Sequence, residues 1–166
     1  ARADIRPVLC RQERVGVGIA DGYARASNGK KLAAFCMQYG PGAENAFAGV
    51  AQAGSDSIPI LVLPGGPRRD RRGVPYAFSP ADQYRGIAKW ADEINMPERI
   101  PSLMRRAFHA LRNGRRGPVA IVDSYTQANA ELLGVGDGAL VSYASGDNRP
   151  SALACGQDAA TITVSS

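Results

Sequence analysis

The chain has 166 residues, of which 45% are apolar and 21% are charged, and its formal net charge is +5. This length and composition are typical of one globular domain with a sizeable core. The sequence has no apolar run of about eighteen residues, so we expect no membrane-spanning helix. The N-terminal residues also lack the apolar segment of a signal peptide.

The three cysteines, Cys10, Cys36 and Cys155, are widely spaced. They form no Cys-x-x-Cys pair and no Cys/His cluster, so we predict no metal site. Cys10 and Cys36 lie in apolar runs and are predicted to be buried, reduced thiols, which favours a cytoplasmic location.

Four arginines fall within residues 68–72. Such a positive run can bind nucleic acid or an anionic substrate. No aromatic residues interleave with these arginines, and no helix-turn-helix or RNA-binding pattern surrounds them. We therefore interpret the run as a solvated loop and do not expect nucleic acid as a partner.

The first part of the chain alternates between apolar runs of strand length and segments with helical spacing. The pattern predicts strands at 5–9, 32–37 and 59–63, and helices at 11–27 and 43–54. Asn28-Gly29 is predicted to end the first helix, and Gly40-Pro41-Gly42 separates the second strand from the second helix.

The second part begins with residues 64–86, which are rich in proline and glycine and are predicted to form a long loop. Trp90 and Ile94 lie in a predicted short strand or helical turn. Residues 100–111 give a clear amphipathic helix, and 118–123 a last buried strand. Residues 124–166 have few large apolar side chains, so we predict a domain at 1–123 and a weakly ordered tail or start of a linker at 124–166.

Alternating buried strands and helices indicate an α/β fold, in which a parallel sheet is flanked by helices on both faces. Ligands of such sheets bind at the carboxyl ends of the strands. Glu13 follows the first predicted strand, and Gly40 follows the second. For an isolated glutamate, a first-turn residue that interacts with the helix dipole would be the better interpretation.

Three motifs occur in this order: Arg11-Gln12-Glu13, then Ala20-Asp21-Gly22-Tyr23-Ala24-Arg25, then Gln38-Tyr39-Gly40-Pro41-Gly42-Ala43-Glu44-Asn45. They resemble the N-terminal, pyrimidine-binding domain of thiamine-diphosphate enzymes of the acetolactate synthase type. In that family the motifs read R-H-E, A-D-G-Y-A-R and S-G-P-G-A-T-N. The resemblance extends from about residue 5 to residue 123 and implies this family's fold, without its first strand and helix.

The resemblance implies that Glu13 is catalytic. In the family this glutamate hydrogen-bonds the aminopyrimidine of thiamine diphosphate and thereby promotes proton loss from the thiazolium ring. It further implies that Gly40, Pro41 and Gly42 line the pyrimidine pocket, with Asn45 packed behind them. Glycine at these positions allows the backbone to approach a flat ring closely.

The resemblance also places Gln12, Gln38 and Tyr39 at the substrate pocket. Phe78 could form a wall of the same pocket, or it could equally be a loop aromatic that packs on its neighbours. The chain departs from the family pattern at several of these positions. Gln12 stands where the family often has histidine, and Gln38-Tyr39 replaces a small Thr-Ser pair. Ser79 replaces a glutamine of the family's A-F-Q-E stretch.

The implied parent is an oligomeric enzyme, a homodimer or homotetramer, that decarboxylates 2-oxo acids and joins the product to a second carbonyl compound. Only the pyrimidine half of the cofactor would be bound here. Mg²⁺ is expected from a C-terminal domain, and FAD is left open. Gly136-Asp137-Gly138 has the wrong flanks for that domain's metal motif, so we interpret it as a turn.

Two further hypotheses remain open. The parent could be another thiamine-diphosphate lyase or acyltransferase, such as a sulfoacetaldehyde acetyltransferase or a 2-oxo acid decarboxylase. The chain could also be a non-catalytic interaction module. As a fragment of such an enzyme, the isolated chain is expected to be inactive, because it supplies only half of the active site.

Overall fold

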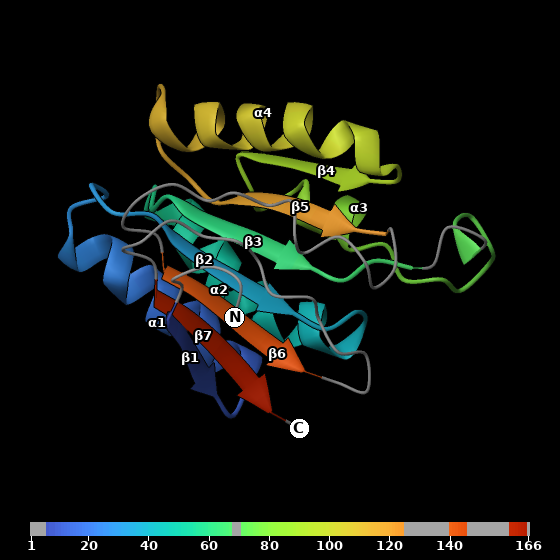
Figure 1. The fold of residues 1–166 in the computed structure, drawn as a ribbon, viewed down its shortest axis with the longest axis horizontal. Coiled ribbons are helices and arrows are strands. Elements are labelled where there is room, and N and C mark those ends of the chain that lie inside the picture. Colours follow the sequence, from blue (N-terminus) through green and yellow to red (C-terminus); the bar gives the residue numbers. More distant parts are fainter. Residues whose placement is uncertain (1–5, 68–70, 125–139, 146–159, 166) are drawn as a thin grey trace.

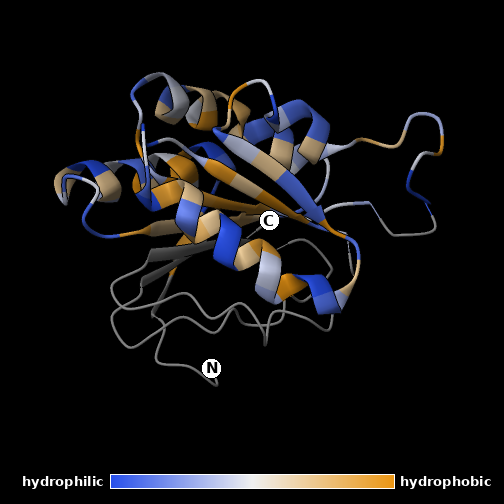
Figure 2. Cartoon of the chain, turned by 90° about the horizontal axis from the view of Figure 1, so that it is seen from above, coloured by the Kyte–Doolittle hydropathy of each residue, from blue (hydrophilic) through white to orange (hydrophobic). Residues whose placement is uncertain are grey.

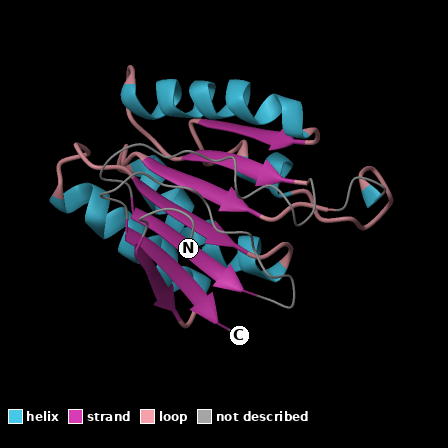
Figure 3. Cartoon of the chain, in the orientation of Figure 1, coloured by secondary structure: helices cyan, strands magenta, loops and turns pink. Residues whose placement is uncertain are grey.

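A computed structural model of the chain describes residues 6–67, 71–124, 140–145 and 160–165. These residues form one sheet with helices on both of its faces (Figure 1). Figure 3 shows the strands with their arrowheads at the same edge of the sheet.

The strands are β1 (Arg6–Cys10), β2 (Ala33–Met37), β3 (Ile60–Pro64), β4 (Trp90–Ile94), β5 (Val119–Asp123), β6 (Leu140–Ser145) and β7 (Ala160–Ser165). The helical elements are α1 (Glu13–Ala26), α2 (Pro41–Ser55), α3 (Pro80–Tyr84), the short 3₁₀ helix η2 (Pro97–Arg99) and α4 (Ile100–Arg112).

The strand order is β1-β7-β6-β2-β3-β5-β4, and each neighbouring pair is parallel. The register places Phe35 of β2 beside Val62 of β3, and Ala91 of β4 beside Ala120 of β5. This topology confirms the prediction of an α/β fold with a parallel sheet.

Successive residues of each central strand point to opposite faces of the sheet, and each face has its own core. Phe35 packs with Val17 of α1 and Val50 of α2 on one face. Cys36 packs with Leu103 and other residues of α4 on the opposite face. Figure 2 shows mainly hydrophobic colours on the central strands and mixed colours on the helices, as expected for a covered sheet.

The two helices that carry the candidate site lie against each other at a glycine. A Cβ atom on Gly49 of α2 would lie 2.2 Å from Cγ1 of Val17 on α1. Only a residue without a side chain fits this approach, so the sequence of α2 sets the short distance between the helices.

The strand predicted at Trp90 to Ile94 is β4, which resolves the alternative of a helical turn. The prediction of an uninterrupted loop at 64–86 is wrong, because Pro80–Tyr84 forms α3. The Oγ atom of Ser79 accepts a hydrogen bond from the backbone N–H of Asp82 and thereby caps this helix.

Two segments of the range 124–166 form strands, β6 and β7, which the composition of that range did not predict. They lie between β1 and β2 in the sheet. The Gly136-Asp137-Gly138 triplet, predicted as a turn, and Cys155 lie outside the described residues. In the described part of the chain, no helix is both long enough and apolar enough to cross a membrane.

Candidate functional site

The candidate site lies at the carboxyl edge of the parallel sheet. Glu13 is the first residue of α1, which follows β1, and Gly40 connects β2 to α2. Because α1 and α2 pack side by side on one face of the sheet, their N-terminal turns meet. The structure therefore brings together residues that are 32 positions apart in the sequence.

Glu13 is the buried acid of this site, with only 7% of its surface exposed. Its Oε2 atom accepts a hydrogen bond of 3.3 Å from Nδ2 of Asn45. Among the described residues, Glu13 has no ion-pair partner. An amide and the N-terminal turn of α1 therefore stabilise the carboxylate, and none of the described cations neutralises it.

Gly42 allows the backbone of α2 to lie close to this carboxylate. A Cβ atom on Gly42 would lie 3.2 Å from Oε1 of Glu13 and 2.6 Å from Cγ of Gln38. Any larger residue would push against the acid or against the Gln38 side chain. The glycine thus lets the Glu13 carboxylate and the Gln38 side chain lie against the backbone of α2.

Gly40 forms the turn that starts α2. Its backbone has φ 71° and ψ −113°, in the region that favours glycine. Pro41 follows in the first turn, where its missing N–H leaves no intrahelical bond unmade. The order Gly-Pro-Gly therefore has a separate structural reason at each position.

Tyr39 and Phe78 form a second contact beside the site. The Tyr39 hydroxyl donates a hydrogen bond of 3.0 Å to the backbone carbonyl of Phe78, and the ring centroids are 6.3 Å apart. Tyr39 is 38% exposed, so its ring contributes to the accessible surface. This contact links the turn before α2 to the loop before α3.

Gln12, the remaining predicted pocket residue, occupies the N-cap position of α1. Its side chain is exposed and makes no capping hydrogen bond. The structure thus groups Glu13, Gln38, Gly42 and Asn45, and it places Tyr39 with Phe78. Gln12 stays at the outer surface of the site.

Two supporting residues were not predicted from the sequence. Tyr84 of α3 is fully buried, and its hydroxyl donates a hydrogen bond of 2.6 Å to the carbonyl of Ala43 in the first turn of α2. Burial raises the pKa of Tyr84 well above its ordinary value. A lone tyrosine in a segment predicted as a loop carries no pattern that would identify this role.

The second supporting contact is an ion pair between Arg72 and Glu93. Nη2 of Arg72 lies 2.9 Å from Oε2 of Glu93, which is only 7% exposed. Arg72 belongs to the arginine run interpreted as a solvated loop; it is exposed, and its guanidinium also pairs with this buried carboxylate. Arg71 is exposed, and residues 68–70 lie outside the described part of the chain. The pair attaches the loop that carries Phe78 to β4.

Metal ligation has no support in the part of the chain that the structure describes. No group of three histidine, cysteine, aspartate or glutamate residues is placed there to hold a metal ion. The chemistry of the described site therefore depends on one carboxylate, its amide partner and the surrounding backbone.

The sequence matches a family model described as "Thiamine pyrophosphate enzyme, N-terminal TPP binding domain" over residues 1–91. It is also similar to the acetolactate synthase large subunit of Haemophilus influenzae, with 34% identity over 120 residues, which are 70% of this chain and 20% of that protein. The acetolactate synthase isozyme 3 large subunit of Escherichia coli is 37% identical over 117 residues, covering 69% of this chain and 20% of that protein. For chloroplastic acetolactate synthase 2 of Nicotiana tabacum the identity is 40% over 120 residues, covering 70% and 18%.

The parallel sheet and the buried acid at its carboxyl edge define an α/β ligand-binding domain. The chain belongs to the thiamine pyrophosphate enzyme family, to which it contributes an N-terminal TPP binding domain. The chain spans about a fifth of the length of the curated relatives that it matches.

Proposed function

We propose that this chain is the pyrimidine-binding part of an enzyme that resembles acetolactate synthase and acts on 2-oxo acids by decarboxylation and carboligation. The observation that carries the proposal is the position of Glu13. This acid is buried at the carboxyl edge of the sheet, beside a glycine backbone, in a chain of the thiamine pyrophosphate enzyme family.

The residues at the edge fit the aminopyrimidine of thiamine diphosphate. A carboxylate accepts a hydrogen bond from a protonated ring nitrogen, and Glu13 has no cation that competes for it among the described residues. Gly42 has no side chain, so the Glu13 carboxylate and the Gln38 side chain lie against its backbone at the edge where the ring would bind. When bound, the cofactor supplies a thiazolium carbon that acts as a nucleophile toward the carbonyl of a 2-oxo acid.

In this proposal Glu13 accepts and returns a proton through its side-chain oxygen, Oε1, which faces Gly42. Asn45 holds the other oxygen, Oε2, and fixes the orientation of the carboxylate. Gly40 and Pro41 shape the turn that places Gly42. Positioning of this kind is the contribution a protein makes when the cofactor carries the reaction itself.

Tyr39 and Phe78 are proposed to bound the substrate side of the site, with Gln12 and Gln38 at its rim. The hydrogen bond from the Tyr39 hydroxyl to the Phe78 carbonyl holds this wall in place. The bulk of Tyr39 would restrict the size of the 2-oxo acid that fits, so this residue is the proposed determinant of substrate choice.

The second half of the active site is proposed to come from a diphosphate-binding domain of another subunit in a homodimer or homotetramer. That domain would hold Mg²⁺ and the diphosphate, and the enzyme would act in the cytoplasm. Since the present chain supplies only the pyrimidine side, the isolated 166 residues should show no turnover.

The test uses a polypeptide that joins this chain to its diphosphate-binding domain. With thiamine diphosphate, Mg²⁺ and pyruvate it should release carbon dioxide and form acetolactate. Glu13→Gln should lower the rate by roughly 100-fold or more, because it removes the proton-transferring group. A folded, cofactor-loaded enzyme whose rate is unchanged by Glu13→Gln would overturn the proposal, as would turnover by the isolated chain.

A further inference from the structure

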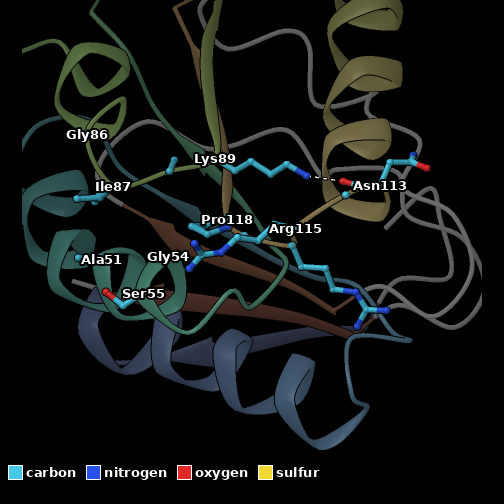
Figure 4. A pocket seen from close by; sticks show the side chains of 13 residues that line it. Ala51, Gly54, Ser55, Gly86, Ile87, Lys89, Asn113, Arg115 and Pro118 are labelled. Atoms are coloured by element: carbon cyan, nitrogen blue, oxygen red, sulfur yellow. Dashed lines mark hydrogen bonds between the residues drawn. The ribbon is translucent and has the colours of Figure 1, made fainter.

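A basic pocket lies at the sheet edge opposite Glu13. It has a volume of about 590 Å³ and is bounded by the end of α2, the segment before β4 and the segment before β5. Figure 4 shows Ala51, Gly54 and Ser55 of α2 on one side, with Lys89 and Arg115 across from them. Lys89 precedes β4 and Arg115 precedes β5, so the pocket is at the amino edge of the parallel sheet.

A smaller hollow of about 110 Å³ adjoins this pocket and shares Arg116 with it. Cations line both spaces: Lys89, Arg115 and Arg116 in the larger one, and Lys30, Arg112 and Arg116 in the smaller one. Neither lining contains an aspartate or a glutamate. Both hollows are therefore positively charged, and the name basic pocket is kept for the larger one.

The carboxylate that follows the α2 wall is already engaged elsewhere. Oδ2 of Asp56 lies 2.5 Å from Nη2 of Arg25, which belongs to α1 and does not line the pocket. The hydrogen bond from Arg25, together with one from Gln52, holds the pKa of Asp56 below its ordinary value. Asp56 is thus already paired with a cation outside the pocket.

Among the described residues, Arg115 and Arg116 donate side-chain hydrogen bonds only to uncharged oxygens. Nε of Arg115 donates to Oγ of Ser57 at 2.8 Å, and Nη1 of Arg116 donates to the carbonyl of Asn28 at 2.7 Å. Neither forms an ion pair with any carboxylate in the described part of the chain. Each guanidinium is therefore held in place while other N–H groups remain for a ligand.

Lys89 removes a feature that would otherwise repel anions. The last carbonyls of a helix carry partial negative charge, and α4 ends beside the pocket. Nζ of Lys89 lies 2.5 Å from the carbonyl oxygens of Ala110 and Asn113, as the dashed line in Figure 4 shows for Asn113. The lysine offsets the partial negative charge of this helix end, so the two arginines make the electrostatic potential of the pocket positive.

The lining also limits the kind of anion. It contains no aromatic side chain on which a base could stack, and four of its residues are glycines: Gly54, Gly86, Gly114 and Gly117. The volume is in the range of small-molecule sites, which is about 300–1,000 Å³. A compact ligand with several charged oxygens fits these features better than a nucleobase does.

We propose that the basic pocket binds a small, non-aromatic polyphosphate whose oxygens contact Arg115 and Arg116. The guanidinium group suits this ligand because its planar donors match phosphate oxygens in pairs. The site is separate from the one around Glu13, since the two lie at opposite edges of the sheet. The proposal therefore gives this domain an anionic ligand in addition to its cofactor.

Isothermal titration of the 166-residue chain with inorganic tripolyphosphate in 0.15 M salt tests the proposal. Saturable binding of one equivalent is expected. Arg115→Gln and Arg116→Gln should each raise the dissociation constant roughly tenfold, which corresponds to the loss of one charged hydrogen bond. Arg105→Gln is the matched control, because Arg105 is exposed on α4 and lines neither hollow, and it should leave the affinity unchanged.

Arg112→Gln changes a residue that lines only the smaller hollow, and it should weaken binding less than Arg115→Gln does. Circular dichroism of every variant checks that the variant is folded. Absence of saturable binding would overturn the proposal, and so would an equal loss of affinity in Arg105→Gln. Binding of a short DNA duplex in the absence of tripolyphosphate binding would also overturn it, by making the region a surface for polymers.

Discussion

The amide of Asn45 on α2 donates a 3.3 Å hydrogen bond to the carboxylate of Glu13 on α1. Each residue lies near the N-terminus of a helix that follows a different parallel strand. The orientation of the acid therefore depends on how the two helices pack, and Gly42 and Gly49 permit this close packing.

Gly42→Ala should damage the site with little loss of stability. The new methyl group would lie 3.2 Å from Oε1 of Glu13 and would displace the flexible Gln38 side chain. We expect thiamine to bind about tenfold more weakly, a loss of about 1.4 kcal/mol. The gain in helix propensity of about 1 kcal/mol offsets part of the steric cost.

Gly18→Ala is the control for that substitution. Gly18 lies on the exposed side of α1, and a Cβ atom there would meet nothing within 4 Å. It should stabilise the fold by about 0.5–1 kcal/mol and leave thiamine binding unchanged. Chemical denaturation and a thiamine titration of both variants provide the comparison. Equal binding by the two variants would contradict the role given to Gly42.

Arg72→Gln should destabilise the chain more than Glu93→Gln does. Arg72 is half exposed and can return to water, whereas Glu93 is nearly buried and would be left without its partner. We expect a loss of about 1–3 kcal/mol for Arg72→Gln. The double variant should recover part of this loss, and urea unfolding of all three measures it. An equal cost of the two single substitutions would contradict this account of the pair.

Tyr84→Phe should lower stability at neutral pH by about 0.5–1.5 kcal/mol, because the hydrogen bond to Ala43 is lost. It should also change the pH dependence. Burial raises the pKa of Tyr84 above its ordinary 10.0, so the folded state holds the phenol proton more tightly than the unfolded state does. This contribution is complete below about pH 10 and is lost as the pH rises toward the folded-state pKa.

The melting temperature of the unsubstituted chain should therefore fall more steeply above pH 10 than that of Tyr84→Phe. Calorimetric melting of both proteins between about pH 8 and 11 gives the comparison. Curves that stay parallel over this range would show that ionisation of Tyr84 is not linked to unfolding.

Tyr39→Phe should loosen the wall beside the site. The variant keeps the ring contact with Phe78 and loses the hydroxyl bond to its carbonyl. In the joined enzyme we expect KM for pyruvate to rise severalfold while kcat changes little, since the hydroxyl acts on the wall and not on Glu13. A large loss of kcat with unchanged KM would place Tyr39 in the reaction itself.

Much of the fold was predictable because burial leaves a periodic trace in the sequence. The strands at Ala33–Met37 and Ile60–Pro64 are covered on both faces and are therefore continuously apolar. The helix Ile100–Arg112 repeats its apolar residues at helical spacing. The Gly-Pro-Gly turn likewise predicted where α2 begins, since each residue has a specific backbone preference.

The rest left no such trace. The strands β6 and β7 come from a stretch of small and polar residues, and their place between β1 and β2 is a long-range property of the sheet. Tyr84 and the Arg72–Glu93 pair depend on contacts between distant segments. A local pattern can suggest that Glu13 is a site residue, but only the tertiary structure shows that Asn45 is the residue that holds it.

The central claim is that Glu13 is the pyrimidine-binding acid. Its most direct test is a titration of the 166-residue chain with thiamine, in which amide chemical shifts are the readout. The unsubstituted chain should show saturable shifts around Glu13 and Gly42. Glu13→Gln should weaken this binding roughly tenfold, while Glu44→Gln, which changes an exposed acid on the first turn of α2, should not. Equal affinity of Glu13→Gln and the unsubstituted chain would contradict the assignment of Glu13 as the pyrimidine-binding acid.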